Sequence, residues 1–291
     1  MKHQNIQTTI IISIIVWASC IFHTHAWGPI THLYLCSLAD NETTTSSTLD
    51  SFYTGCNSPD MLKKEWPELH SLEFAAELFW NAYKSTNGTD DLIEFSLGFG
   101  CHIASDEVGH HSKGFLNPPS ADHVIEFNLD SMIYHERIGE KFGTTTKHEL
   151  SEREIDLIIR TASQHTFMLS ATHRNLRHEV RRPSVIDRAR IQSAAKHFQL
   201  LTSAERSLIR IQPPSLYKFE LQRNSFCNVS NYQEVITNYN VSEKWAVSTC
   251  NLWRSTMWSL VKRSDLDEAA AIMHRAVNEL FQSNNGTSCV I

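Results

Sequence analysis

Apolar residues recur at intervals of three and four along most of this chain, and this spacing constrains the fold more than any other feature. It is clear between Leu69 and Tyr83, and again between Leu157 and Leu169. Such intervals place side chains on one face of an α-helix, whereas a half-buried strand requires strict alternation. Long alternating segments are nearly absent from the sequence. We therefore predict an all-α protein.

Several of the predicted helices begin where residues that cap helix N-termini precede an apolar repeat. Ser151 and Glu154 have the spacing of a capping box, and Ser264 with Asp265 opens the last repeat. We place helices at residues 30–40, 68–84, 90–108, 120–140, 152–170, 186–201, 232–262 and 265–283. We place loops at residues 41–59, 112–119, 143–150 and 212–215, where Thr, Ser, Gly or Pro gather.

The size of the chain is sufficient to bury a full core. It has 291 residues, of which 41% are hydrophobic, and domains typically have about 100–200 residues. We expect one large domain at residues 27–291, with residues 210–291 either inside it or forming a helical appendage. The formal charge is −6 and there is no long run of Lys or Arg, which argues against binding duplex nucleic acid through its phosphates.

Residues 1–26 have the three parts of a secretory signal peptide. Lys2 and His3 give a weakly basic start, an apolar run covers residues 10–22, and a small-residue cleavage site covers residues 24–26. The apolar run is shorter than the roughly 20 residues that a spanning helix needs. We predict cleavage after Ala26, secretion, and a mature protein with no transmembrane segment.

The cysteines and glycosylation sequons agree with this prediction. Of seven cysteines, Cys20 would leave with the signal peptide, and the remaining six most simply form three disulfides, with fifteen pairings available. Cys227 and Cys250 are close enough in sequence for a local bridge. Sequons that predict a glycoprotein occur at Asn41, Asn87, Asn228, Asn240 and Asn285.

The densest group of metal-binding residue types lies in an otherwise apolar segment. His102, Asp106 and His110 are four residues apart, which places them within an arc of about 80° on a helix. Burying these side chains without partners is costly, and a divalent cation satisfies all three at once. The alternative is a hydrogen-bonded core histidine beside a helix-capping Asp. We predict a metal site.

Further candidate ligands lie on both sides of this group. His123, Glu126 and Asp130 have spacings of three and seven, so they share one helix face. Asp60 follows a proline, which is a common position for a turn or capping residue. His70 lies further along the chain, and its side chain is also a possible metal ligand.

Trp27 becomes a candidate ligand through its own backbone. Cleavage after Ala26 would expose an α-amino group with a pKa of about 8, which in its neutral form chelates a metal together with the carbonyl oxygen of the same residue. Pro29 is favourable at the start of a helix, and that helix would direct His32 back toward the terminus.

Taken in order, these residues resemble the zinc-dependent phospholipase C family. The resemblance rests on Trp27-Gly-Pro-Ile-Thr-His32, Ser58-Pro-Asp60, His70, the spacing His102-x3-Asp106-x3-His110, and His123. The resemblance covers residues 27–140. Within the family, the chain is most similar to the amino-terminal domain of glycosylphosphatidylinositol-specific phospholipase D. Single-strand-specific fungal and plant nucleases share the same plan. The remainder of the chain is similar to the family only in being helical.

The resemblance implies a multi-helix phospholipase C/nuclease-like domain with three zinc ions in one cleft. Each zinc would have its own ligands. The first set is Asp60, His70, His102 and Asp106; the second is the amino nitrogen and carbonyl of Trp27, with His32 and the other oxygen of Asp106; the third is His110, His123 and a carboxylate.

The third site departs from the family pattern. The family places the carboxylate four residues after the histidine, and this chain has Phe127 there. We assign Glu126 instead, with Asp130 as the alternate, so the third zinc has the weakest support. His111 competes with His110 but points about 100° away on an unbroken helix.

The resemblance also implies the hydrolysis of a phosphodiester by metal-activated water, with Asp60 as the catalytic residue that orients the water. We expect a secreted zinc-dependent phosphodiesterase that acts on phospholipid, with only peripheral membrane contact. The first alternative is a single-strand nuclease or nucleotidase, although Glu-Val-Gly-His110 stands where those nucleases resemble one another in Gln-Pro-Leu-His. The second alternative is a non-catalytic, zinc-bearing, lipid-binding glycoprotein, which would explain the imperfect third site.

Overall fold

The computed structural model describes residues 27–39, 46–86, 90–111, 114–116, 122–139, 149–172, 186–225, 227, 229–261 and 267–283. Every regular element in these ranges is helical, which confirms the all-α prediction. None of these helices combines the length and the apolar character needed to cross a bilayer. The predicted signal peptide and the sequons at Asn41, Asn87, Asn228 and Asn285 lie outside the described residues.

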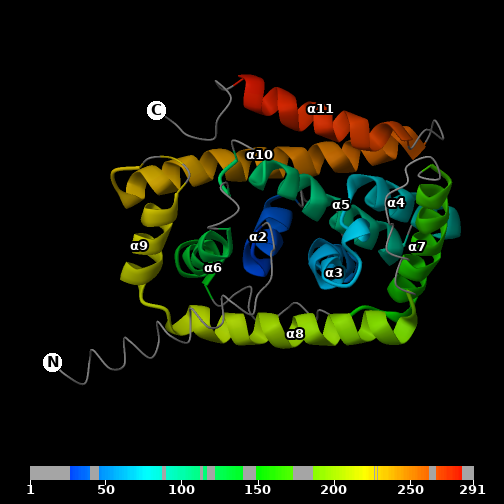
Figure 1. The fold of residues 1–291 in the computed structure, drawn as a ribbon, viewed down its shortest axis with the longest axis horizontal. Helices are drawn as coiled ribbons and strands as arrows, with labels where there is room; N and C mark the ends of the chain where they lie inside the picture. The colour runs from blue at the N-terminus through cyan, green and yellow to red at the C-terminus, as the bar shows by residue number, and fades with distance from the viewer. Residues whose placement is uncertain are drawn as a thin grey trace.

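The helices form a bundle enclosed by long outer helices. Figure 1 shows α10 and α8 along opposite sides, α2, α3 and α6 between them, α9 and α7 at the two ends, and α11 outside α10. In chain order the elements are α2 (Pro29–Ala39), α3 (Ser46–Lys63), the 3-10 helix η1 (Pro67–Leu69), α4 (Leu72–Thr86), α5 (Asp91–Gly109), α6 (Asp122–Ile133), the π-helix η3 (Tyr134–Ile138), α7 (Glu152–Thr172), α8 (Arg188–Ile211), α9 (Pro214–Asn224), α10 (Tyr232–Val261) and α11 (Asp267–Ser283).

Helix α5 is the central element of the bundle. Almost every residue between Leu92 and Gly109 is buried, and α3, α4 and α10 pack around it. A helix that is apolar on all sides must lie inside a protein, because any exposed face would leave apolar surface in water. Asp90 is the N-cap of this helix, and its side chain accepts a hydrogen bond from the backbone N–H of Leu92.

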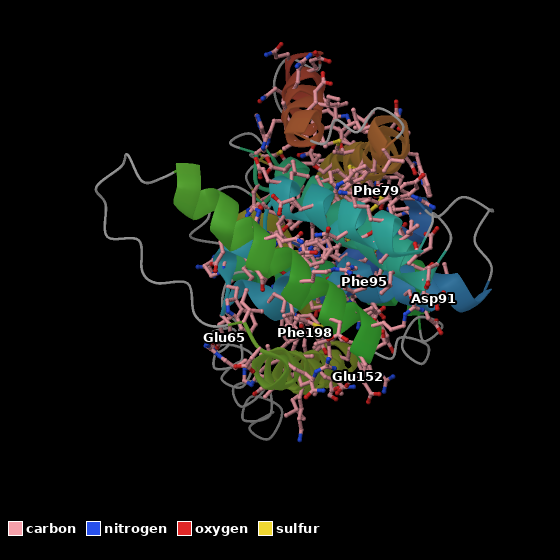
Figure 2. All side chains as sticks on the ribbon, turned by 90° about the vertical axis from the view of Figure 1, so that its right-hand side faces the viewer. Glu65, Phe79, Asp91, Phe95, Glu152 and Phe198 are labelled. Atoms are coloured by element: carbon pink, nitrogen blue, oxygen red, sulfur yellow. A yellow bond between two sulfur atoms is a disulfide. The ribbon has the colours of Figure 1, made fainter. Side chains whose placement is uncertain are left out.

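Apolar side chains fill the bundle in two clusters. One surrounds α5 and includes Phe95 and Phe198, which Figure 2 shows inside the bundle. The other lies between α2, α6, α9 and α10 and includes Trp27 and Tyr217. The first cluster surrounds the helix that carries His102, and the second surrounds the start of α2.

The backbones of α3 and α5 are in direct contact at two glycines. A methyl group on Gly98 would lie 2.0 Å from the carbonyl oxygen of Phe52, and one on Gly55 would lie 2.0 Å from that of Phe95. Real side-chain carbons essentially never approach another atom this closely, so the crossing requires glycine on both helices. This contact sets the separation of the two helices that contribute most of the site described below.

Two disulfides link these helices to their neighbours. Cys36–Cys56 joins α2 to α3, and Cys101–Cys250 joins α5 to α10. The predicted bridge between Cys227 and Cys250 is therefore wrong, although Cys227 is also disulfide-bonded. Proximity in sequence favoured the local pairing, but the packing of α10 along α5 brings together two cysteines that are 149 residues apart.

The loop predicted at residues 41–59 is also wrong, because residues 46–63 form α3. The segment is rich in Ser and Thr and contains Pro59 inside the helix, and both features disfavour a helix locally. Phe52 and Cys56 lie four residues apart and are fully buried. The burial of this apolar face against α5 outweighs the weak local propensity.

A second helix was missed where we predicted a loop at residues 212–215. Helix α9 begins there with a proline in its first turn, a position where the absent N–H has no intrahelical partner to lose. Its buried residues are Tyr217 and Leu221, which lie four apart. Three further predictions differ in their bounds. Helix α8 continues to Ile211, and the helix predicted at 120–140 changes to π geometry at Tyr134. The helix predicted at 68–84 is divided into η1 and α4, with His70 between them.

The predicted capping box at the start of α7 is present. The backbone N–H of Ser151 donates to Glu154 Oε2 at 2.6 Å, and the backbone N–H of Glu154 donates to Ser151 Oγ at 3.3 Å. These reciprocal bonds satisfy two N–H groups at the helix start that would otherwise have no partner. The spacing of the two residues therefore identified this helix start correctly.

Substitution of Gly98 by alanine tests the contact between α3 and α5. Helix propensity and packing predict opposite changes in the stability of this variant. On propensity alone, Gly98→Ala would stabilise the helix by about 1 kcal/mol. We expect instead that the free energy of unfolding falls by roughly 1–3 kcal/mol, because the methyl group forces α3 and α5 apart. Denaturant unfolding with the disulfides intact measures the difference. As a control, Ser203→Ala on an exposed position of α8 should change the stability by no more than about 0.5 kcal/mol. A more stable Gly98→Ala protein would contradict the crossing.

Candidate metal centre

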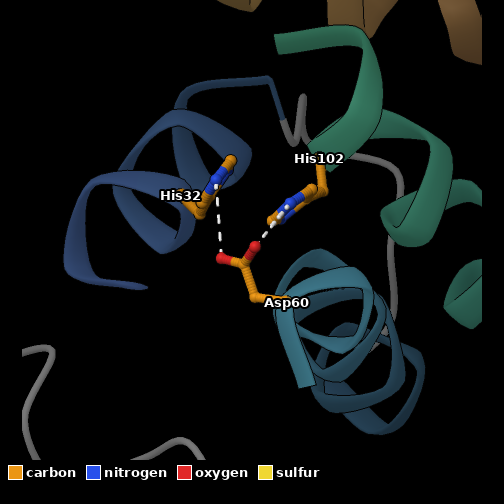
Figure 3. Close-up of side chains that lie close together, drawn as sticks. All are labelled: His32, Asp60 and His102. Carbon is orange, nitrogen blue, oxygen red and sulfur yellow. Dashed lines mark ion pairs between the residues drawn. The ribbon is translucent and has the colours of Figure 1, made fainter. Parts of the chain in front are cut away.

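Five polar side chains converge where α2, α3 and α5 meet. Their potential ligand atoms form two overlapping groups, each lying within 4.8 Å of one another. The residues are His32 on α2, Asp60 on α3, His70 just after η1, and His102 and Asp106 on α5. All are buried except His70, which is partly exposed. Figure 3 shows Asp60 between His32 and His102, contributed by three different helices.

The two carboxylates each lie between histidines. The Nε2 atom of His32 is 3.1 Å from Asp106 Oδ1 and 4.0 Å from Asp60 Oδ2. His70 Nε2 lies 3.3 Å from Asp106 Oδ2 and 3.8 Å from Asp60 Oδ1. His102 Nε2 lies 3.5 Å from each of these last two oxygens. Both carboxylates therefore turn one oxygen toward His32 and the other toward His70 and His102.

The tautomer of His102 determines what its Nε2 atom can bind. Its Nδ1 lies 2.7 Å from the carbonyl oxygen of Cys56, which only accepts hydrogen bonds, so Nδ1 carries the hydrogen. In the neutral ring, Nε2 then presents a lone pair to two carboxylates and to His70 Nε2, which is 3.2 Å away. These groups repel one another unless a cation or proton lies between them. A metal-ligating histidine is commonly held by a carbonyl in this way.

Several of these close approaches are not hydrogen bonds. Both ring nitrogens of His32 and both carboxylate oxygens of Asp106 are buried and have no hydrogen-bond partner among the described residues. Each such group costs about 1–3 kcal/mol when it is left unsatisfied. These nitrogen and oxygen atoms lie close together around one point and do not bond to one another. A divalent cation at that centre would satisfy them all, so the residues fit a metal ion.

The charges in the cluster shift the pKa values of the histidines in opposite directions. Burial lowers the pKa of His102, but the carboxylates of Asp60 and Asp106 outweigh burial and raise it to about 10. Burial, together with the charge of His102, lowers the pKa of His32 to about 4. Burial raises the pKa of Asp106, but the two histidines hold it well below its ordinary value. In the metal-free protein, a proton on His102 supplies the positive charge that the carboxylates require.

The start of α2 is positioned by Asp130 on α6. Asp130 Oδ2 accepts from the N–H of Ile30 at 3.0 Å, and Oδ1 accepts from the N–H and hydroxyl of Thr31 at 2.8 Å and 2.6 Å. A methyl group on Gly28 would lie 2.5 Å from the same carboxylate, so a larger residue at this position would displace the cap. Burial raises the pKa of Asp130 to about 6. Asp130 therefore caps the helix that carries His32. Its alternate role as a ligand of the third zinc stays a prediction.

Trp27 is anchored beside the cluster by its ring. The indole is fully buried, and its Nε1 donates to the carbonyl oxygen of Ser105 at 2.9 Å. It stacks on Phe115 with the ring centroids 6.4 Å apart, and Tyr239 meets it edge-on. This anchor ties the ring of Trp27 to the residue that precedes Asp106. The predicted role of the terminal amine stays a prediction.

The residues predicted for a third zinc do not form a cluster among the described side chains. His110 is the C-cap of α5, one residue beyond the end of the helix at Gly109, and it is exposed. Glu126 is buried on α6, but no group of metal-binding side chains in the described part of the chain includes it or His110. The side chain of His123 lies outside the described residues. The third zinc stays a prediction.

A cavity of about 220 Å³ adjoins the cluster. Its lining residues are Lys63, His70, Ile103, Asp106, Glu107, His110 and His111. Lys63 and Glu107 are not among the predicted site residues. Lys63 lies three residues after Asp60, which puts both on one face of a helix. The spacing indicates a shared face only if the segment is helical, and residues 41–59 have the composition of a loop.

Comparisons with known proteins do not assign the chain to a family. No protein-family model matches it, and searches of curated proteins and of solved structures find no significant match.

The opposite pKa shifts predict how the stability of the metal-free protein depends on pH. His32 has a lowered pKa in the folded state, so the free energy of unfolding should rise as pH increases from about 4 to 6.5. His102 has a raised pKa, so its contribution is fully present below pH 6.5 and is lost as pH rises toward about 10. Denaturant unfolding with a chelator present, at a series of pH values, measures both changes.

Two controls isolate the contribution of the cluster. His102→Gln should lack the decline above pH 6.5, because the substituted side chain does not titrate. Added zinc should reduce the same decline, since a metal ion takes the place of the proton. If the wild-type stability without metal does not change between pH 6.5 and 10, the assigned charge of His102 is incorrect.

Proposed function

We propose that this protein is a secreted, zinc-dependent phosphodiesterase that hydrolyses phospholipids. The observation that carries the proposal is the arrangement of Asp60 and Asp106, each of which turns one oxygen toward His32 and the other toward His70 and His102. Carboxylates in this arrangement are suited to hold two metal ions close together. Paired metal ions are common in enzymes that hydrolyse phosphate esters.

The types of ligand atom support zinc. Three imidazole nitrogens and two carboxylates form the cluster, and Zn²⁺ binds nitrogen and carboxylate oxygen in such sites. Mg²⁺ and Ca²⁺ are bound mainly through oxygen, so a cluster with three histidines does not suit them. The burial of the cluster also favours a resident ion over one that is exchanged with each substrate.

The chain's own residues would divide between two ions. Asp60, His70, His102 and Asp106 would hold the first, and His32 with the other oxygen of Asp106 would hold the second, together with the backbone of Trp27 after signal cleavage. When bound, the ions supply positive charge that stabilises the phosphate and lowers the pKa of water. Asp60 would accept a hydrogen bond from the attacking water and orient it toward phosphorus.

The cavity suits the headgroup end of a lipid. Its volume of about 220 Å³ is below the range of about 300–1,000 Å³ for pockets that enclose a drug-sized ligand. A phosphate ester headgroup would enter beside His70 and Asp106, while the acyl chains remained outside in the bilayer. Membrane contact would then be peripheral.

The central experiment is Asp106→Asn in the secreted, signal-cleaved protein. Loss of an outer partner of a metal ligand costs about 10–100-fold in affinity or activity, so the loss of a residue shared by two ions should reduce turnover by more than a hundredfold. The helical circular dichroism spectrum should be unchanged. Zinc content by elemental analysis should fall, and release of phosphorylated headgroup from phospholipid vesicles measures turnover.

Asp91→Asn is the matched control, since it makes the same chemical change on the same helix at an exposed position. It should retain its zinc and its activity. Wild-type turnover in Asp106→Asn would exclude the metal-centre mechanism. If the wild-type protein binds zinc but cleaves single-stranded DNA and not phospholipid, the substrate assignment is wrong and the nuclease alternative holds.

The proposed role of the terminal amine has its own test. A protein that keeps one additional alanine before Trp27 has an amide in place of the amine, and an amide nitrogen does not chelate zinc under these conditions. We expect it to hold one zinc fewer than the protein that begins at Trp27, with the same fold. Elemental analysis combined with amino-terminal sequencing gives the comparison. Equal zinc content in the two proteins would remove Trp27 from the set of ligands.

A further inference from the structure

Lys63 lines the cavity together with His70, Asp106 and His110. It lies in the last turn of α3, three residues after Asp60, so the two side chains leave the same face of the helix. Its side chain is partly buried, whereas that of Lys64 is exposed. Lys63 therefore contributes a basic side chain to the wall of the cavity that adjoins the candidate metal centre.

The charge of Lys63 is not neutralised by a carboxylate within the described part of the chain. Other basic residues do have such partners, including Lys218, which lies 3.0 Å from Glu136 Oε1. On the cavity wall, Glu107 approaches His274 at 3.5 Å and Asp106 approaches the clustered histidines. Lys63 is thus a cation available to an anion that enters the cavity.

We propose that Lys63 binds an anionic oxygen of the phosphate group and makes the cavity selective for phosphate ligands. A lysine ammonium is a compact charge with three donors, and it is a common phosphate ligand. The phosphate would lie between this ammonium and the candidate metal centre. The identity of the ligand as a phosphoester rests on the proposed function.

A purely structural role for Lys63 is the competing explanation. A lysine in the last turn of a helix interacts favourably with the negative end of the helix dipole. Such a role changes thermal stability but not the affinity for phosphate. The two explanations therefore predict different measurements on the same variant.

The test uses Lys63→Gln, with Lys64→Gln as the matched control, in the zinc-loaded mature protein. Isothermal titration with inorganic phosphate measures binding without turnover. We expect phosphate to bind about tenfold more weakly, or weaker still, in Lys63→Gln, because one charge-assisted hydrogen bond is lost. Lys64→Gln should bind as the wild type does, and Lys63→Arg should recover part of the affinity. Zinc content should be equal in all variants.

Three results would overturn the inference: unchanged phosphate affinity in Lys63→Gln, a lower thermal stability as its only effect, or a loss of zinc that accounts for weaker binding. The proposed function fails separately. A protein that binds phosphate through Lys63 but hydrolyses no phosphodiester supports the role of Lys63 and contradicts the enzyme. A protein that hydrolyses phospholipid with the same KM in Lys63→Gln contradicts only the role of Lys63.

Discussion

Where α3 crosses α5, the carbonyl oxygens of the two helices occupy the space that side chains at positions 55 and 98 would fill. At this separation Asp60 Oδ1 lies 3.5 Å from His102 Nε2. Zinc–ligand bonds are about 2.0–2.2 Å long, so one ion reaches both atoms only if the helices stay this close. A larger residue at the crossing would add more to the distance than a metal site tolerates. The cluster of metal-binding residues therefore depends on glycine at positions 55 and 98.

The disulfides reinforce the same geometry at positions next to the cluster. Cys36 lies four residues after His32, and its partner Cys56 lies four residues before Asp60, so the bridge joins α2 and α3 one turn from each of these residues. The carbonyl of Cys56 also orients the ring of His102. A disulfide, a backbone carbonyl and the cap from Asp130 therefore hold the three helices and the ring of His102 in position around the cluster.

The sequence predicts part of this arrangement, for reasons that lie in the spacing of residues. His102 and Asp106 were identifiable because two polar side chains four residues apart in an apolar helix need a shared partner. Helix α3 was not, because its polar composition and internal Pro59 disfavour a helix until the chain packs against α5. The role of Asp130 was also hidden. It caps a helix about 100 residues earlier in the chain, and such a long-range bond leaves no periodic pattern.

The Cys101–Cys250 disulfide joins residues that are synthesised at different times. All five clustered residues are synthesised before α10, yet Cys101, the neighbour of His102, has its partner 149 residues later in the chain. Until that partner is made, α5 lacks both the covalent link and the face of α10 that covers it, including the Trp253 ring packed against Gly100. An amino-terminal fragment carries every residue of the cluster without the support that holds them rigid. The support around the cluster is therefore complete only after α10 has been synthesised.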